Sequence, residues 1–276
     1  MSSNPDQPSV DAALEDEMSG PVNYERRGLA GIVNLASTAD RNAISLAMIG
    51  EVKAAVQRAY DDEDVRYVVL THTGNTFCAG ADLREQKGFG ATPEHLQVRR
   101  GLELGDLFSL LLAGPKPVVG AVYGHVRAGG TGLVAACDVV FAGPEASFAM
   151  TEVRIGAAPT VTVAVLEERL TPRALAELSM RGNVIDAAEA QRVGLITRVV
   201  PDVDEALDSF AADLQAAGPS GLEAAKGLAN RRVVDNVARR TPELAVLSAR
   251  LFMAAEAQAG MRAFLRHEPA PWAPQD

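Results

Sequence analysis

The sequence contains little cysteine and no long apolar run. Only two cysteines, Cys78 and Cys137, occur among its 276 residues. Each lies in an apolar segment of small residues, which favours buried, unreactive thiols in a reducing compartment over a disulfide framework. No apolar run reaches the roughly 18 residues that a membrane-spanning helix needs, and the first 20 residues are acidic and polar, unlike a signal peptide. We therefore expect a cytoplasmic protein that does not bind membranes.

Acidic residues outnumber basic ones in the chain as a whole. The sequence has 26 Lys and Arg against 36 Asp and Glu, a formal net charge of -10. Because nucleic-acid phosphates require a basic stripe and none is visible, we expect no nucleic-acid partner. The first 20 residues contain no Lys or Arg but five acids, namely Asp6, Asp11, Glu15, Asp16 and Glu17. We expect residues 1–20 to form a disordered acidic tail.

Common catalytic and metal-binding motifs are also missing. The sequence has no His-x-x-x-His, no Cys-x-x-Cys and no Asp/Asn-rich loop, so we expect no metal site. None of the four histidines is near a Gly-x-Ser-x-Gly elbow, which argues against Ser/His/Asp catalysis.

Short apolar strands alternate with helices over residues 21–200, which predicts one α/β core. The predicted strands are residues 31–35, 65–71, 118–122, 139–142, 146–150 and 195–200, and the first three predicted helices are residues 45–60, 92–112 and 130–137. Residues 201–276 form a predicted helical region, with helices at about 204–218, 222–237 and 243–259. Thr171-Pro172 and Thr241-Pro242 have the pattern of a helix N-cap followed by a first-turn proline, and Asp186 with Glu189 has capping-box spacing.

Two loops of small residues offer exposed backbone amides. One is the glycine-rich turn from Arg127 to Gly132, which leads into a predicted helix, and the other runs from Phe77 to Asp82. Glycines at a helix entry leave the N–H groups accessible, and the helix dipole adds positive potential there. Close helix packing or a turn is the better explanation of a single glycine pair, but a second loop of this kind favours an oxyanion hole, because two donors must converge on one oxygen.

A lone carboxylate follows these loops. Glu152 lies two residues beyond Met150, at the end of a short apolar strand. It is either an exposed surface group or a desolvated acid/base with a raised pKa, and its sequence context leaves both possibilities open.

Together these segments resemble the enoyl-CoA hydratase/isomerase (crotonase) superfamily. The resemblance rests on Phe77-Cys78-Ala79-Gly80-Ala81-Asp82-Leu83, on the stretch from Pro117 to Asp138 and on Phe148-Ala149-Met150-Thr151-Glu152-Val153-Arg154-Ile155-Gly156. A further segment from Ala187 to Ile196 is similar to the family's lead-in to its trimerisation domain, so the resemblance extends from about residue 22 to Phe264.

The resemblance implies a spiral of ββα units over residues 21–200 and a helical trimerisation region over residues 201–276. It implies a homotrimer or a dimer of trimers that binds acyl-CoA thioesters and stabilises an enolate, with no cofactor besides the CoA of the substrate. By position, Ala81 and Gly129 would supply the oxyanion-hole amides and Glu152 the acid/base. The CoA portion would contact Arg41, Ala79, Gly80 and Arg84, and Phe264 would cover the adenine from a neighbouring helix.

The sequence departs from the two-glutamate members of that family at Gly132, where they have a second carboxylate. Hydration needs a water activated for attack at the β-carbon and a proton delivered to the α-carbon. Either Glu152 performs both steps through a bound water, or another group helps. The candidates are Thr131, Thr160, Thr162 and His125, although each is expected to be a packing residue. A single glutamate also resembles relatives that move a double bond. We therefore predict an enoyl-CoA hydratase, with an enoyl-CoA isomerase and a non-catalytic acyl-CoA binding protein as alternatives.

Overall fold

A computed structural model describes residues 20–85 and 93–274. The expected acidic tail lies outside the described residues, apart from Gly20. Within the described ranges, no helix is long and apolar enough to cross a membrane.

The larger of two sheets has six strands. Its order is β1 (Val22–Arg27), β2 (Ala30–Leu35), β3 (Tyr67–His72), β5 (Val118–Val122), β7 (Val139–Ala142) and β10 (Arg198–Val199). β1 pairs with β2 in antiparallel fashion, and the other neighbours are parallel. The central strands are nearly continuous runs of valine and other apolar residues because helices cover both faces of a parallel sheet.

The smaller sheet has four short strands in the order β4 (Thr76–Cys78), β6 (His125–Arg127), β8 (Ser147–Ala149) and β9 (Ile185–Asp186). β4, β6 and β8 are parallel, whereas β9 is antiparallel to β8. The chain places β3, β5 and β7 in the large sheet and each following strand in the small one. Because α3 follows β4 and α4 follows β6, the predicted spiral of ββα units is confirmed.

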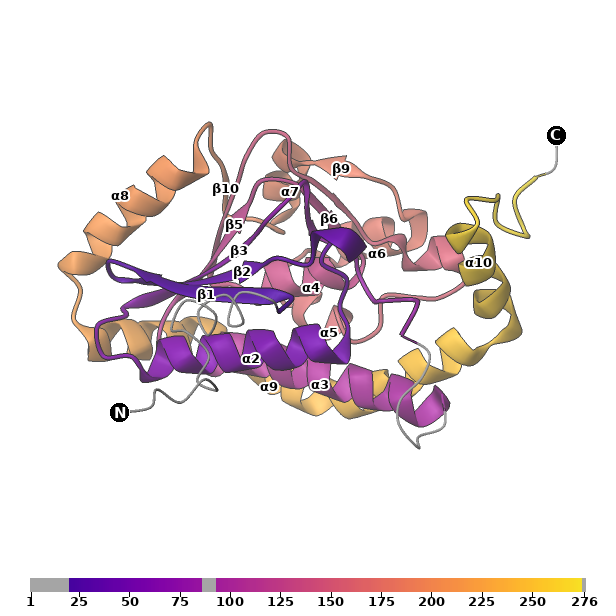
Figure 1. Cartoon of the computed structure of the whole chain (residues 1–276), viewed down its shortest axis with the longest axis horizontal. Coiled ribbons are helices and arrows are strands. Elements are labelled where there is room, and N and C mark those ends of the chain that lie inside the picture. The colour runs from indigo at the N-terminus through magenta and orange to yellow at the C-terminus, as the bar shows by residue number, and fades with distance from the viewer. Residues whose placement is uncertain (1–19, 86–92, 275–276) are drawn as a thin grey trace, which may run out of the picture.

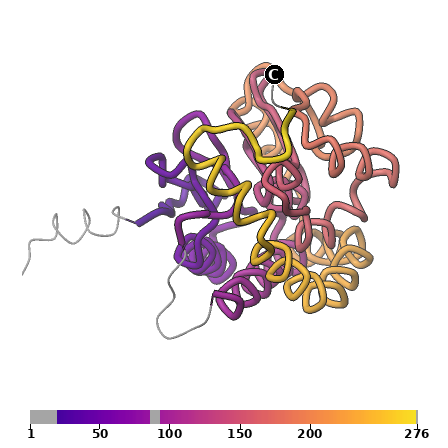
Figure 2. The backbone as a smooth tube through the Cα atoms, turned by 90° about the vertical axis from the view of Figure 1, so that its right-hand side faces the viewer, coloured from indigo at the N-terminus to yellow at the C-terminus, as the bar shows by residue number. Residues whose placement is uncertain are grey.

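The helices pack on both sides of the large sheet. Their bounds are η1 Thr38–Asp40, α2 Leu46–Asp61, α3 Pro93–Ala113, α4 Gly129–Ala136, η2 Thr151–Ile155, α5 Val163–Leu166, α6 Pro172–Arg181, α7 Ala187–Val193, α8 Val203–Gln215, α9 Pro219–Met253 and α10 Ala255–Leu265. α2, α3 and α9 run along one side of the sheet (Figure 1). On the other side, α8 packs Phe210 and Leu214 against Tyr67 and Phe141. Figure 2 shows α10 across one end of the core, where it contacts η2.

Side-chain caps begin several helices where the sequence predicts them. Ser45 accepts from the Met48 amide at the start of α2, and Thr171 accepts from the Ala174 amide at the start of α6. The Asp186 side chain accepts from Glu189 N, so Asp186 caps α7 as its spacing predicts. These bonds satisfy amides that have no partner within the helix.

The prediction that a helix begins at Thr241-Pro242 is wrong. Pro242 lies inside α9, which replaces the two helices expected at 222–237 and 243–259 with one of 35 residues. A proline within a helix costs about 3 kcal/mol. Close packing of α9 against α3 offsets this cost. The two helices cross at two glycines of α3, which leave room for α9. A Cβ atom added at Gly101 would lie 2.8 Å from Ala245 Cβ, and one added at Gly105 would lie 2.2 Å from Thr241 Cγ2.

Both cysteines are free and buried, as predicted. Burial raises the pKa of the Cys78 and Cys137 thiols to about 12. Since the thiolate is the reactive form, both are unreactive at neutral pH.

Candidate active site

Three parallel strands of the small sheet end at one place. Cys78 of β4 pairs with Val126 of β6, and Arg127 of β6 pairs with Ala149 of β8. Parallel strands present their carboxyl ends at the same sheet edge, where open α/β folds bind ligands. The segments carrying Ala81, Gly129 and Glu152 therefore leave the sheet side by side.

The first two of these segments touch. Gly80 has φ +93°, and a Cβ atom on it would lie 2.7 Å from Ala128 Cβ and 3.6 Å from the Gly129 nitrogen. Ala128 itself has φ +46°, a region that favours glycine. This contact brings the loop after β4 to the first turn of α4.

Ala81 and Gly129 supply amides that are free to bind a ligand. Ile44 holds the first loop on both sides of Ala81: its N–H donates to Gly80 O at 2.7 Å and its carbonyl accepts from Asp82 N at 3.1 Å. Among the described residues, the structure has no hydrogen bond donated by the Ala81 or Gly129 amide. Both residues line one cavity. Two such amides are the donor set of an oxyanion hole.

Glu152 is a desolvated acid in the same cavity. It lies in η2, directly after β8, with 7% of its surface exposed. Its Oε2 atom is buried and has no hydrogen-bond partner in the part of the chain that the structure describes. Burial raises the pKa of the Glu152 carboxyl from 4.5 to about 7. Of the two possibilities open at Glu152, an exposed surface group is excluded by this burial, and its role as an acid/base stays a prediction.

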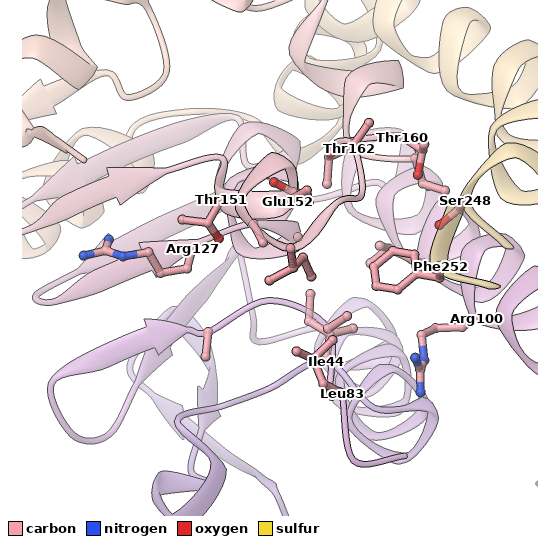
Figure 3. A pocket seen from close by; sticks show the side chains of 18 of the residues that line it. Ile44, Leu83, Arg100, Arg127, Thr151, Glu152, Thr160, Thr162, Ser248 and Phe252 are labelled. Carbon is pink, nitrogen blue, oxygen red and sulfur yellow. The ribbon is translucent and has the colours of Figure 1, made fainter. Parts of the chain in front are cut away.

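The cavity has a volume of about 550 Å³. Figure 3 shows Glu152 and Thr162 in its upper part and Ile44 with Leu83 below them. Residues that the sequence singles out and that line it are Arg41, Ala79, Ala81, Gly129, Glu152, Thr160, Thr162 and Phe264. Gly80 is buried beneath the loop, and Arg84 is exposed and outside the lining. Phe264 approaches from α10 of the same chain and is 59% exposed.

Four arginines contribute to the lining of the cavity. Arg41, Arg100, Arg127 and Arg154 all line the cavity. Arg100 is buried and ion-paired with Glu85. Arg41 is exposed. In a chain with formal net charge -10, this local excess of arginine makes the cavity suitable for an anionic ligand.

Gly132 lies behind the cavity, in a space with no room for a side chain. A Cβ atom there would lie 2.5 Å from Phe108 Cζ and 2.8 Å from Thr162 Cγ2. Among the other candidate helpers, the Thr131 hydroxyl donates to Ala128 O at 2.7 Å, and His125 is exposed with its Nδ1 2.9 Å from Ser147 Oγ. These two are structural. Thr160 and Thr162 line the cavity.

Sequence reasoning did not assign to the site the cavity residues that come from α3 and α9. They include Gln97, Arg100 and Leu104 of α3 and Ser248 and Phe252 of α9. Helical periodicity identifies the buried face of α3, but it does not reveal which of those residues border an empty space. The glycines Gly101 and Gly105, four residues apart, were the only signal of a close helix crossing beside the site.

Known proteins are similar to this chain in sequence and in architecture. A family model described as enoyl-CoA hydratase/isomerase matches residues 27–275. Enoyl-CoA hydratase EchA19 of Mycobacterium tuberculosis is 36% identical over 214 residues, covering 75% of this chain and 79% of that protein. The rat protein named "Enoyl-CoA hydratase domain-containing protein 3, mitochondrial" is 29% identical over 95% of this chain and 87% of its own length.

The solved structures agree. A crystal structure of an enoyl-CoA hydratase from Mycobacterium avium superposes with a TM-score of 0.85 at 39% identity, covering 93% of this chain and 100% of that one. Because the family model matches most of the chain and the superposition extends over 93% of it, the chain belongs to the enoyl-CoA hydratase/isomerase (crotonase) superfamily.

Proposed function

We propose that the protein is an enoyl-CoA hydratase, which adds water across the double bond of a 2-enoyl-CoA. One observation carries the proposal: the buried Glu152 carboxyl shares a cavity with the unbonded amides of Ala81 and Gly129. Hydration requires a base for water, a proton donor for C2 and a site for the enolate oxygen. A single carboxylate and two amides supply all three.

In the proposed addition, the water oxygen bonds to C3 while one of its protons passes to the Glu152 carboxylate. The electrons of the C2=C3 double bond move to the thioester oxygen, where the Ala81 and Gly129 amides bind the enolate charge. Glu152 then returns the proton to C2, which restores both the thioester and the free carboxylate. A carboxyl pKa of about 7 suits a group that must accept and return a proton at neutral pH.

The CoA portion is proposed to lie along the arginine-bearing mouth of the cavity. Arg41 is exposed at the cavity lining and fits a phosphate, and Ala79 and Gly80 present backbone beside it. The exposed Phe264 ring offers a surface on which an adenine can stack. Arg84 is exposed outside the lining, so it would reach a phosphate only from the rim.

An enoyl-CoA isomerase is the second candidate. The observation that favours it is Phe108, which fills the space beside Gly132 with an apolar ring instead of a second carboxylate. Moving a double bond needs one base that removes and returns a proton, and Glu152 alone meets that need. A purely binding protein is the third alternative, but it would have no use for a desolvated carboxyl next to two free amides.

The activities are distinguished by substrate and by one variant. The hydratase consumes the conjugated-enoyl absorbance of crotonyl-CoA, whereas an isomerase creates that absorbance from a 3-enoyl-CoA. Glu152→Gln should lower turnover by about 10²–10⁴-fold while acyl-CoA affinity changes little. Unchanged turnover in this variant, or acyl-CoA binding without turnover of any enoyl-CoA by the parent protein, would contradict the proposal.

Residues 201–276 are proposed to carry the interface of a homotrimer or a dimer of trimers. α9 exposes Leu228 (79%) and Val246 (57%), large apolar side chains that an interface would cover. Light scattering coupled to gel filtration would report the mass, and a monomer at micromolar concentration would contradict this part. A cytoplasmic location stays a prediction, and cell fractionation tests it.

A further inference from the structure

The cavity next to Glu152 contains a second buried polar atom without a partner. Thr162 is 3% exposed, lines the cavity and has a buried Oγ1 with no hydrogen bond among the described residues. A buried hydroxyl without a partner costs about 1–3 kcal/mol relative to a bonded one. Glu152 Oε2 is in the same condition in the same cavity.

Local helix chemistry does not account for the Thr162 hydroxyl. Thr162 occupies the N-cap position of α5, where a threonine side chain ordinarily accepts a bond from an amide of the first turn. Here the side chain makes no cap bond. Only the Thr162 carbonyl bonds to the helix, where it accepts from Val165 N and Leu166 N. The hydroxyl is therefore left available to the cavity.

The position of Thr162 places it beside the reacting groups. Its methyl carbon lies against Gly132, with 2.8 Å to an added Cβ. Gly132 is three residues from Gly129 in α4, so the two lie on the same face of the helix. On the other side of Gly132, Phe108 contributes only ring carbons. Thr162 therefore lies next to the place where family members with two glutamates have their second carboxylate, with its methyl carbon against Gly132 and its hydroxyl on the same Cβ.

We propose that the Thr162 hydroxyl and the Glu152 carboxylate together hold the water that adds to C3 of the enoyl group. This inference rests on the proposed hydratase function. The water gives one proton to Glu152 during the attack and donates its second hydrogen to Thr162 Oγ1, which keeps a lone pair on the water oxygen for C3. Thr162 changes neither its charge nor its protonation, so the proton balance of the addition is that of Glu152 alone.

This role is chemically different from that of a second carboxylate. A buried site of this kind suits a bound water because two residues that line one cavity each carry an unpaired polar atom. Isomerisation involves no water at C3, so a hydroxyl held for water has no task in that reaction. The Thr162 hydroxyl therefore favours hydration over isomerisation.

Thr162→Val tests the inference because it removes the hydroxyl and keeps the shape of the side chain. We expect hydration of crotonyl-CoA to fall at least about tenfold in kcat, the effect of one lost hydrogen bond to the reacting water, with KM changed less. A second assay uses butyryl-CoA, a saturated thioester, in deuterated water. Exchange of its C2 proton needs Glu152 and the two amides but no added water, so Thr162→Val should leave the exchange within about twofold of the parent.

Two further variants complete the experiment. Thr162→Ser keeps the hydroxyl and should recover most of the lost hydration rate. Thr241→Val is the matched control, because Thr241 is buried with an unpartnered Oγ1 but does not line the cavity, and its hydration rate should equal the parent's. If Thr162→Val folds poorly, Thr162→Ala provides the same two measurements.

The outcomes separate this inference from the function on which it rests. Unchanged hydration in Thr162→Val, or an equal fall in hydration and exchange, overturns the water-holding role but leaves a hydratase in place. A parent protein that exchanges the C2 proton but hydrates no enoyl-CoA overturns the proposed function itself. A selective loss of hydration that Thr162→Ser reverses supports both.

Discussion

The Gly80 backbone lies so close to the Ala128 side chain that a Cβ atom added at Gly80 would lie 2.7 Å from the Ala128 Cβ. Both residues have positive φ, +93° and +46°, in a region that costs a non-glycine residue about 1–3 kcal/mol. The contact sets the separation between the two proposed oxyanion amides, since Ala81 follows Gly80 and Gly129 follows Ala128. Of the two, Ala128 is the strained residue, because glycine adopts positive φ readily.

Gly80→Ala should separate the two loops and weaken the oxyanion hole. Because loss of one oxyanion donor typically costs about 10²–10³-fold in rate, we expect kcat for crotonyl-CoA to fall by up to that factor. Gly28→Ala is the control, because Gly28 also has positive φ, +57°, but an added Cβ would meet nothing within 4 Å. Both variants should lose stability in urea unfolding, and only Gly80→Ala should lose turnover. Equal activity in the two variants would contradict the proposed role of the contact.

Gly132→Ala should destabilise the fold by about 1–3 kcal/mol, because the new methyl group would collide with Phe108 Cζ at 2.5 Å. Phe108→Leu removes the ring atom at the collision point. A double-mutant cycle measured by urea unfolding should therefore show a coupling of about 0.5–3 kcal/mol, with the double variant more stable than the sum of the single changes predicts. Additive effects would show that the ring and the glycine are not in contact in solution.

The small sheet shows where prediction from sequence fails in this fold. The strands at 118–122 and 139–142 were predicted with their observed bounds because they are buried apolar runs. β4 and β6 were not predicted, because three residues are too few to show the alternation of apolar and polar side chains that identifies a strand. The loop predicted from Phe77 to Asp82 therefore includes the last two residues of β4, Phe77 and Cys78.

The site itself was partly predictable for a different reason. Ala81, Gly129 and Glu152 lie in local segments with recognisable spacing, and the structure brings all three to one cavity. Thr162 was named only as a possible helper, because its availability depends on a missing cap bond that no sequence pattern indicates. Likewise Pro242 has the appearance of a helix start, and only the packing of α9 on Gly101 and Gly105 shows why the helix continues through it.

The rate should depend on pH through Glu152. Burial raises the pKa of this carboxyl to about 7, and the carboxylate form is the one that accepts a proton from water. We expect kcat/KM for crotonyl-CoA to be constant above about pH 8 and to fall tenfold per unit well below pH 7. A profile that stays flat down to pH 5 would exclude Glu152 as the base.

Glu152→Gln should make the protein more stable at high pH while abolishing most of its turnover. The folded-state pKa of Glu152 lies above its ordinary value of 4.5, so the folded protein binds the proton more tightly than the unfolded chain. Ionising Glu152 therefore lowers the free energy of unfolding as pH rises from about 4.5 to about 7, by about 3 kcal/mol at roughly 1.4 kcal/mol per pKa unit. Glutamine has no charge at this position, so the Glu152→Gln variant does not lose this free energy of unfolding.

The gain in the variant should thus be complete above about pH 7 and absent below about pH 4.5, where the parent carboxyl is protonated in both states. Urea unfolding of parent and variant at pH 8 and pH 4.5, at one protein concentration, measures the two differences. Glu189→Gln is the control, since Glu189 is paired with Arg192 at the surface and has a lowered pKa, so its replacement should give no gain at pH 8. If Glu152→Gln is no more stable than the parent at pH 8, the carboxyl is not desolvated in the folded protein. A site suited to proton transfer is expected to lower the stability of the fold when its carboxyl is ionised. The same environment that destabilises the carboxylate also makes it a stronger base.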